Sequence, residues 1–140
     1  MSDYGMSITL EQDFAACIER TRAALAEQGF GVLTEIDVAA TMKTKLGVDL
    51  PPYLILGACN PPLAHEALTA DPSIGLLLPC NVVVRSIDAG HTLVEAMDPD
   101  VIVKATGNPA LSPTAEQARA KIRAALAALA ADASPSPRPS

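Results

Sequence analysis

The sequence has little positive charge, few cysteines and no long apolar run. Its 10 lysines and arginines stand against 16 aspartates and glutamates, which gives a formal net charge of −6 at pH 7. Because nucleic-acid binding normally needs a basic surface that displaces counterions, this balance argues against a nucleic-acid partner. No apolar run reaches the roughly 18 residues of a membrane-spanning helix, so we expect no membrane partner either.

The cysteines and the N-terminus both bear on the compartment. Three cysteines are too few, and odd in number, for a secreted scaffold held together by disulfides. The first five residues lead into no apolar stretch of the kind that a secretory signal contains. We therefore expect a cytoplasmic protein with reduced thiols.

Apolar residues, in contrast, are abundant, at 49% of the chain against 19% charged residues. This composition excludes disorder over most of the chain and predicts one folded domain over residues 1–131. In residues 132–140 proline alternates mainly with serine, a composition that predicts a disordered tail.

The spacing of apolar residues predicts strands and helices in mixed order. Apolar residues at 14, 18 and 25 predict a helix that a capping box of Thr9 and Gln12 would begin and Gly29 would end. Shorter helices are expected at 39–46 and 60–70, and a long one after Ser112-Pro113, with inner positions 118, 122, 125 and 129. Strands are expected at 6–10, 31–38, 53–57, 81–87, 91–97 and 101–105.

This order of elements predicts an α+β fold, a sandwich in which helices pack on one face of a mostly antiparallel sheet. Such a sheet leaves its other face open unless a partner covers it. Because the charged fraction is low, we expect the partner to be a second copy of the chain, in a homodimer.

Two short segments resemble each other and hold the main candidates for chemistry. Cys59-Asn60 and Cys80-Asn81 each lie at the end or start of an apolar strand and next to a proline. A thiol near a helix N-terminus can be stabilised as the thiolate, which attacks electrophiles and binds soft metals. The alternative is that both cysteines are buried as small apolar residues, as free cysteines commonly are, and we assign Cys17 to packing in this way.

Three further side chains are weaker candidates. His65 lies six residues after Cys59 on a predicted helix, and a Cys/His pair can bind metal or act as nucleophile and base. His65 falls, however, on the outer side of that helix. Glu35 and Asp37 share a strand face with Leu33 and could bind a ligand, although such carboxylates are more often the solvated face of an edge strand.

Four stretches of the sequence carry a resemblance to a known family. They are residues 28–37 (QGFGVLTEID), 46–48 (LGV), 56–61 (LGACNP) and 74–84 (IGLLLPCNVVV). In these stretches the chain resembles the domain of unknown function 302 family over roughly residues 6–129. The resemblance implies a TATA-binding-protein-like β-α-β(4)-α domain, often dimeric, and it carries no activity.

Three functional hypotheses follow from these residues. In the first, Cys59 and Cys80 converge to bind a soft metal, Cu(I) or Zn(II), with His65 as a further ligand, or to cycle through a disulfide. In the second, the domain binds a small molecule without catalysis, and Glu35, Asp37 and the two asparagines supply polar contacts. In the third, it is a protein-interaction module with structural cysteines. Enzymatic turnover is the least supported, because no set of nucleophile, base and orienting residue can be assembled.

Overall fold

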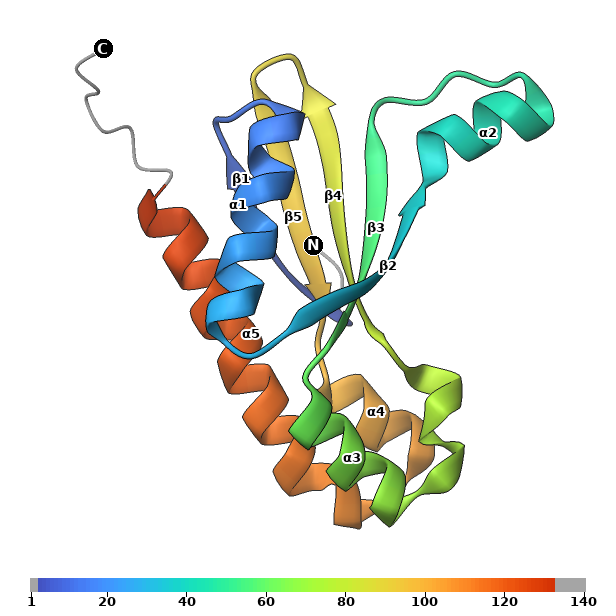
Figure 1. Ribbon diagram of the computed structural model, residues 1–140, viewed down its shortest axis with the longest axis vertical. Helices are drawn as coiled ribbons and strands as arrows, with labels where there is room; N and C mark the ends of the chain where they lie inside the picture. The colour runs from blue at the N-terminus through green and yellow to red at the C-terminus, as the bar shows by residue number, and fades with distance from the viewer. Residues whose placement is uncertain (1–2, 133–140) are drawn as a thin grey trace.

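The computed structural model describes residues 3–132 of the chain. Five strands, five α-helices and two 3₁₀ helices follow one another along these residues (Figure 1): β1 Gly5–Leu10, α1 Phe14–Glu27, β2 Gly31–Asp37, α2 Val38–Leu46, β3 Tyr53–Cys59, α3 Pro61–Ala70, η1 Pro72–Leu77, β4 Cys80–Asp88, β5 His91–Met97, α4 Asp100–Thr106, η2 Pro109–Leu111 and α5 Ser112–Asp132. Apart from Asp132, the predicted tail lies outside the described residues. The prediction of a single domain over residues 1–131 stays a prediction.

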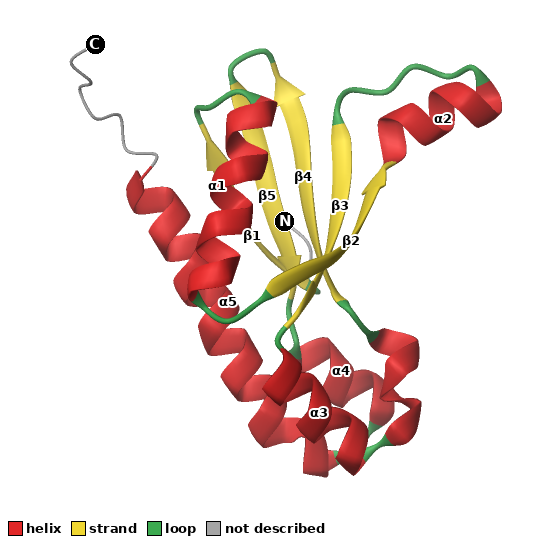
Figure 2. Ribbon diagram, in the orientation of Figure 1, coloured by secondary structure: helices red, strands yellow, loops and turns green. Residues whose placement is uncertain are grey.

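All five strands belong to one antiparallel sheet with the order β1-β5-β4-β3-β2. Helices α1 and α5 lie together against one face of this sheet (Figure 2). Their buried side chains and those of the central strands form the main core, which includes Leu25, Leu56, Val94 and Ile122. The predicted α+β class and antiparallel sheet are therefore confirmed, and α2, α3 and α4 are insertions into the β-α-β(4)-α order.

The remaining helices do not cover that face. Helices α3 and α4 gather at one end of the sheet, beside the first turns of α5, and α2 projects from the opposite end (Figure 1). Ala67, Ile74, Ile102 and Leu111 form a second, smaller apolar cluster among α3, η1, α4 and η2. The molecule thus has two apolar regions, one on the sheet face and one at the end of the sheet.

The start of α1 differs from the prediction. Asp13, whose carboxylate accepts a hydrogen bond from the Ala16 amide at 2.8 Å, caps this helix. The expected capping box is wrong because Thr9 is still part of β1, where it pairs with Leu93. The predicted stop holds, since Gly29 follows the last turn with a φ of 84° that favours glycine.

The predicted strand at 101–105 is also wrong, because these residues belong to α4. Valine and isoleucine favour strands, but tertiary packing overrides this preference here. Ile102 is buried in the second apolar cluster, and the Asp98 carboxylate accepts a hydrogen bond from the Asp100 amide at the start of the helix. Gly107, with a φ of 65°, ends it.

A β-bulge changes the faces of β2. Val32 pairs with Ala58 and Thr34 with Gly57, so Leu33 is the extra residue between them. After the bulge the alternation is reversed, and Glu35 turns toward α1, where it forms an ion pair with Arg22. The expectation that Leu33, Glu35 and Asp37 share one regular strand face is therefore not met.

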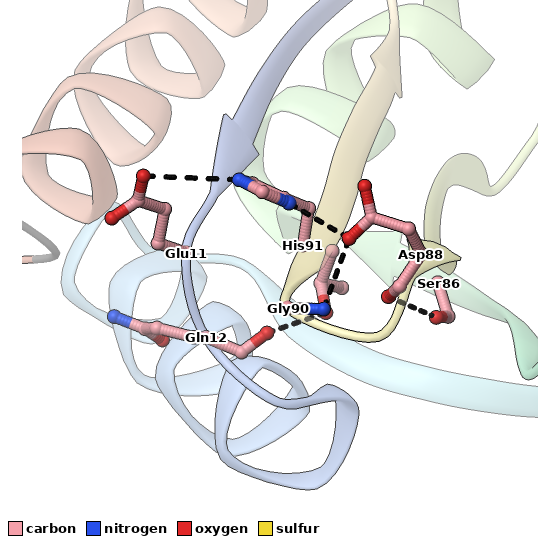
Figure 3. A network of polar contacts seen from close by, with 7 residues as sticks. Glu11, Gln12, Ser86, Asp88, Gly90 and His91 are labelled. Atoms are coloured by element: carbon pink, nitrogen blue, oxygen red, sulfur yellow. Dashed lines mark hydrogen bonds and ion pairs between the residues drawn. The ribbon is translucent and has the colours of Figure 1, made fainter.

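The β4–β5 hairpin turn is joined to the loop before α1 by polar contacts (Figure 3). Imidazole Nδ1 of His91 lies 2.7 Å from the Asp88 carboxylate, and its Nε2 lies 3.8 Å from Glu11. Hydrogen bonding to Asp88 raises the pKa of His91, and the same contact lowers the pKa of Asp88. The Thr92 hydroxyl donates to the carbonyl of Gln12 at 2.8 Å. These contacts are structural and lie away from both Cys-Asn segments.

Candidate ligand-binding site

A cavity of about 330 Å³ lies where the end of the sheet meets α3, α4 and α5. Its walls are almost entirely apolar and include Leu63 from α3, Ile102 from α4 and Leu111 from η2. Ligand cavities in proteins commonly range from about 300 to 1,000 Å³ and have mostly apolar walls with a few polar groups. The cavity is therefore of a size and composition suited to a small apolar molecule.

Both cysteines of the Cys-Asn segments line this cavity. Cys59 is the last residue of β3 and Cys80 the first of β4, and the register pairs Ala58 with Cys80, so the two cysteines are neighbours across the strands. Cys59 is partly exposed, whereas Cys80 is buried. Burial raises the pKa of the Cys80 thiol to about 11, with a smaller contribution from Cys59, so the thiol is protonated at neutral pH.

The two asparagines, in contrast, have different surroundings. Asn60 is buried and lines the cavity. Its side-chain oxygen accepts a hydrogen bond from the Leu63 amide, and its Nδ2 donates to the carbonyl of Gln28 at 3.2 Å. Asn81 is an exposed strand residue that pairs with Gly57 and does not line the cavity. The similar sequences therefore place one asparagine at the site and one outside it.

Asn60 also determines what the N-terminus of α3 can bind. The first two helical residues, Pro61 and Pro62, have no amide hydrogen. The Leu63 amide donates to the Asn60 side chain, and the Ala64 amide donates to the Asn60 carbonyl at 2.8 Å. A helix N-terminus attracts anions through its unpaired amides, and here the first turn has none left.

Close packing at Gly57 shapes the strand next to the cavity. A Cβ at this position would lie 2.1 Å from the Thr34 hydroxyl and 2.8 Å from the Pro79 ring. Glycine within a strand marks such a close approach, because it has no side chain. Gly57 thus lets Pro79, a residue of the cavity wall, fold against β3.

Besides Asn81, three predicted site residues do not lie at the cavity. His65 is exposed on α3, on the outer side as its position predicts, and Glu35 pairs with Arg22. Asp37 caps α2 by accepting a hydrogen bond from the Ala40 amide at 2.9 Å. Among residues 3–132, no group of three or more histidines, cysteines, aspartates or glutamates is arranged to hold a metal ion.

The structure adds residues that pattern reasoning missed. Leu33 and Leu68 line the cavity while 68% and 41% of their surface stays exposed, so they mark its mouth. The bulge in β2 is what turns Leu33 out of the regular alternation. Exposed leucines are a weak signal in a sequence, and only the pairing of β2 with β3 places this one at the mouth.

In the described part of the chain no helix is both long and apolar enough to cross a membrane. No curated protein is significantly similar to the chain. A crystal structure of an uncharacterised conserved DUF302 protein from Bacillus stearothermophilus is similar, with 29% sequence identity and a TM-score of 0.82 over 90% of this chain and 98% of that one. The family model described as "Domain of unknown function DUF302" matches residues 6–129. The chain therefore belongs to the DUF302 family.

Proposed function

We propose that this domain binds a small apolar molecule without catalysis, in the cavity between the end of the sheet and α3, α4 and α5. The observation that carries the proposal is the cavity itself, which combines about 330 Å³ with an almost wholly apolar wall. Water gains few hydrogen bonds in such a space, because a buried water needs two to four polar partners. An apolar ligand would replace poorly bonded water and bury its own surface.

The mouth of the cavity supports the same function. Leu33 and Leu68 are exposed there, and Leu76 and Leu77 on η1 add exposed apolar surface next to Gly75, a residue of the wall. Exposed leucines grouped beside an apolar cavity are typical of a binding site. They would keep contact with the outer end of a ligand that fills the cavity.

Binding can be measured with 1-naphthylamine, a small dye that is uncharged at neutral pH and whose fluorescence shifts to shorter wavelength in apolar surroundings. We expect saturable binding by the wild type and loss of most of it in Ala64→Leu, because Ala64 lines the cavity and is partly exposed, so the larger side chain can enter the space without unfolding α3. Ala70→Leu is the matched control, since Ala70 is exposed on the same helix and does not line the cavity. Equal binding by all three proteins, or none by the wild type, would contradict the proposal.

A soft-metal site is a second candidate, favoured by the shared position of Cys59 and Cys80 on the cavity wall. Two thiolates suffice for Cu(I), whereas structural Zn(II) sites use four ligands. Metal binding would have to remove the Cys80 proton against a pKa of about 11. Competition with a chromophoric Cu(I) chelator tests this candidate: tight binding that the double variant Cys59→Ser/Cys80→Ser loses would favour it over the apolar ligand.

The proposal includes a cytoplasmic homodimer. Cys17, Cys59 and Cys80 are all free thiols, as a reducing compartment keeps them. Helix α2 has no buried residue, and a nine-residue helix is marginal in water without packing partners, so a second copy is the proposed cover. Light scattering coupled to size exclusion should give twice the 14.5 kDa mass of the chain. A monomer at 100 µM would contradict the dimer and leave the ligand site untouched.

A further inference from the structure

We infer that the cavity selects uncharged ligands and excludes carboxylates, phosphates and ammonium groups of the same size. This inference rests on the proposed function and names the class of molecule that the site takes. It follows from three features of the described residues: the composition of the wall, the saturated N-terminus of α3, and the prior engagement of the polar groups that remain.

Among residues 3–132, no lysine, arginine, histidine, aspartate or glutamate lines the wall. The Cys80 thiol carries no compensating charge either, because burial raises its pKa to about 11 and it is protonated at neutral pH. A charged group moved from water into such surroundings loses its hydration and gains no partner, so its transfer is strongly unfavourable. Binding of a charged head group inside the cavity is therefore opposed.

Helix dipoles often stabilise an anion where side chains cannot, and α3 does begin at the cavity. Its first turn, however, has no amide to offer a ligand: Pro61 and Pro62 lack the hydrogen, and the amides of Leu63 and Ala64 are both bonded to Asn60. An anion at this end would face proline rings in place of amides. The usual anion site of a helix N-terminus is thereby closed.

The remaining polar wall groups are already engaged. Asn60 uses its oxygen for Leu63 and its nitrogen for Gln28, and the Thr114 hydroxyl donates to the Glu66 carboxylate at 3.1 Å. The Thr114 oxygen can still accept a hydrogen bond, which suits the hydroxyl of a neutral ligand. Glu66 itself is exposed, so water screens its charge and it contributes little to the discrimination between charged and uncharged ligands.

The volume limits the size of the ligand. At roughly 30 Å³ for a water-sized group, about 330 Å³ holds a molecule of about ten non-hydrogen atoms. The class is therefore a neutral hydrophobe such as a medium-chain alcohol or a small aromatic compound.

Three molecules with the same eight-carbon chain test this selectivity: 1-octanol, octanoate and octylamine, each used to displace 1-naphthylamine at pH 7.5. At this pH the acid is an anion and the amine a cation. We expect octanol to displace the dye at a concentration at least tenfold lower than either charged molecule. Displacement by octanoate or octylamine within tenfold of octanol would overturn the inference and leave the apolar site standing.

A variant tests whether the apolar wall or the exposed charge of Glu66 causes the selectivity. In Glu66→Gln the exposed charge is removed and the wall is unchanged, so the preference for octanol over octanoate should stay above tenfold. A preference that vanishes in this variant would assign the selectivity to Glu66 and overturn the argument from the wall. If the dye does not bind the wild type at all, the proposed function fails, and the inference fails with it.

Discussion

Replacing Asn60 with alanine removes two hydrogen bonds, one that caps α3 and one that joins the start of α3 to the turn after α1. The side chain accepts from the Leu63 amide and donates to the Gln28 carbonyl at 3.2 Å, and the residue is 8% exposed. Loss of a helix N-cap costs about 1 kcal/mol. Loss of the second bond, which leaves a partly buried carbonyl without its partner, adds about 1 kcal/mol.

We therefore expect Asn60→Ala to lower the free energy of unfolding by about 2 kcal/mol, and the midpoint of thermal unfolding by roughly 8 °C for a chain of this size. Urea unfolding followed by circular dichroism at 222 nm measures this change. Asn81→Ala is the matched control, because Asn81 follows the other cysteine and is exposed, and its change should stay within about 0.5 kcal/mol. Equal effects of the two substitutions would refute the different roles assigned to the two asparagines.

Three further predictions concern packing, proton binding and thiol chemistry. Gly57→Ala should destabilise the fold by about 1–3 kcal/mol in urea, because its Cβ would collide with neighbouring atoms, whereas Gly31→Ala, with nothing within 4 Å, should not. An NMR titration should place the pKa of His91 above the usual 6.5, and Asp88→Asn should return it toward that value. The Asp88–His91 contact therefore stabilises the fold fully at pH values between the usual pKa of a carboxyl group and that of imidazole. This stabilisation is lost as the pH rises through the raised pKa of His91, and it is also lost as the pH falls through the lowered pKa of Asp88. The buried Cys80 thiol should react with iodoacetamide at pH 8 at least tenfold more slowly in the folded protein than in urea, as mass spectrometry would show.

The long helices could be predicted from the sequence because the buried residues of each helix lie along one regular stripe. Cys17 and Leu25 of α1 are buried against the sheet, as are Ile122 and Leu129 of α5. Helical spacing of apolar residues is the strongest local signal in a sequence, and both helices have it over three turns or more.

Residues 101–105 could not be predicted in this way. Their valines and isoleucine have strand-forming side chains, and the cause of the helix is a contact far along the chain, where Ile102 meets Ile74 and Leu111. The bulge at Leu33 could not be predicted from the sequence for a similar reason. An extra residue in one strand becomes visible only when that strand is paired with its neighbour, here β2 with β3.

The candidate site could be predicted only in part from the sequence. The two Cys-Asn segments predict Cys59, Asn60, Cys80 and Asn81 as site residues, and all of these except Asn81 line the cavity. Their convergence depends on the β3–β4 register, which pairs Ala58 with Cys80 and cannot be read from residue spacing. The apolar wall could not be predicted because it is built from five separate segments, each of which resembles ordinary core.

The most direct test of the central claim is a methyl NMR titration of the protein with 1-octanol. Binding in the cavity predicts saturable shifts of the methyl groups of Leu63, Ile102 and Leu111, which line the wall, with far smaller shifts for Leu10 and Val94 in the core under α1 and α5. Uniform small shifts over both sets, or changes confined to the exposed leucines, would contradict the claim that this cavity is the binding site.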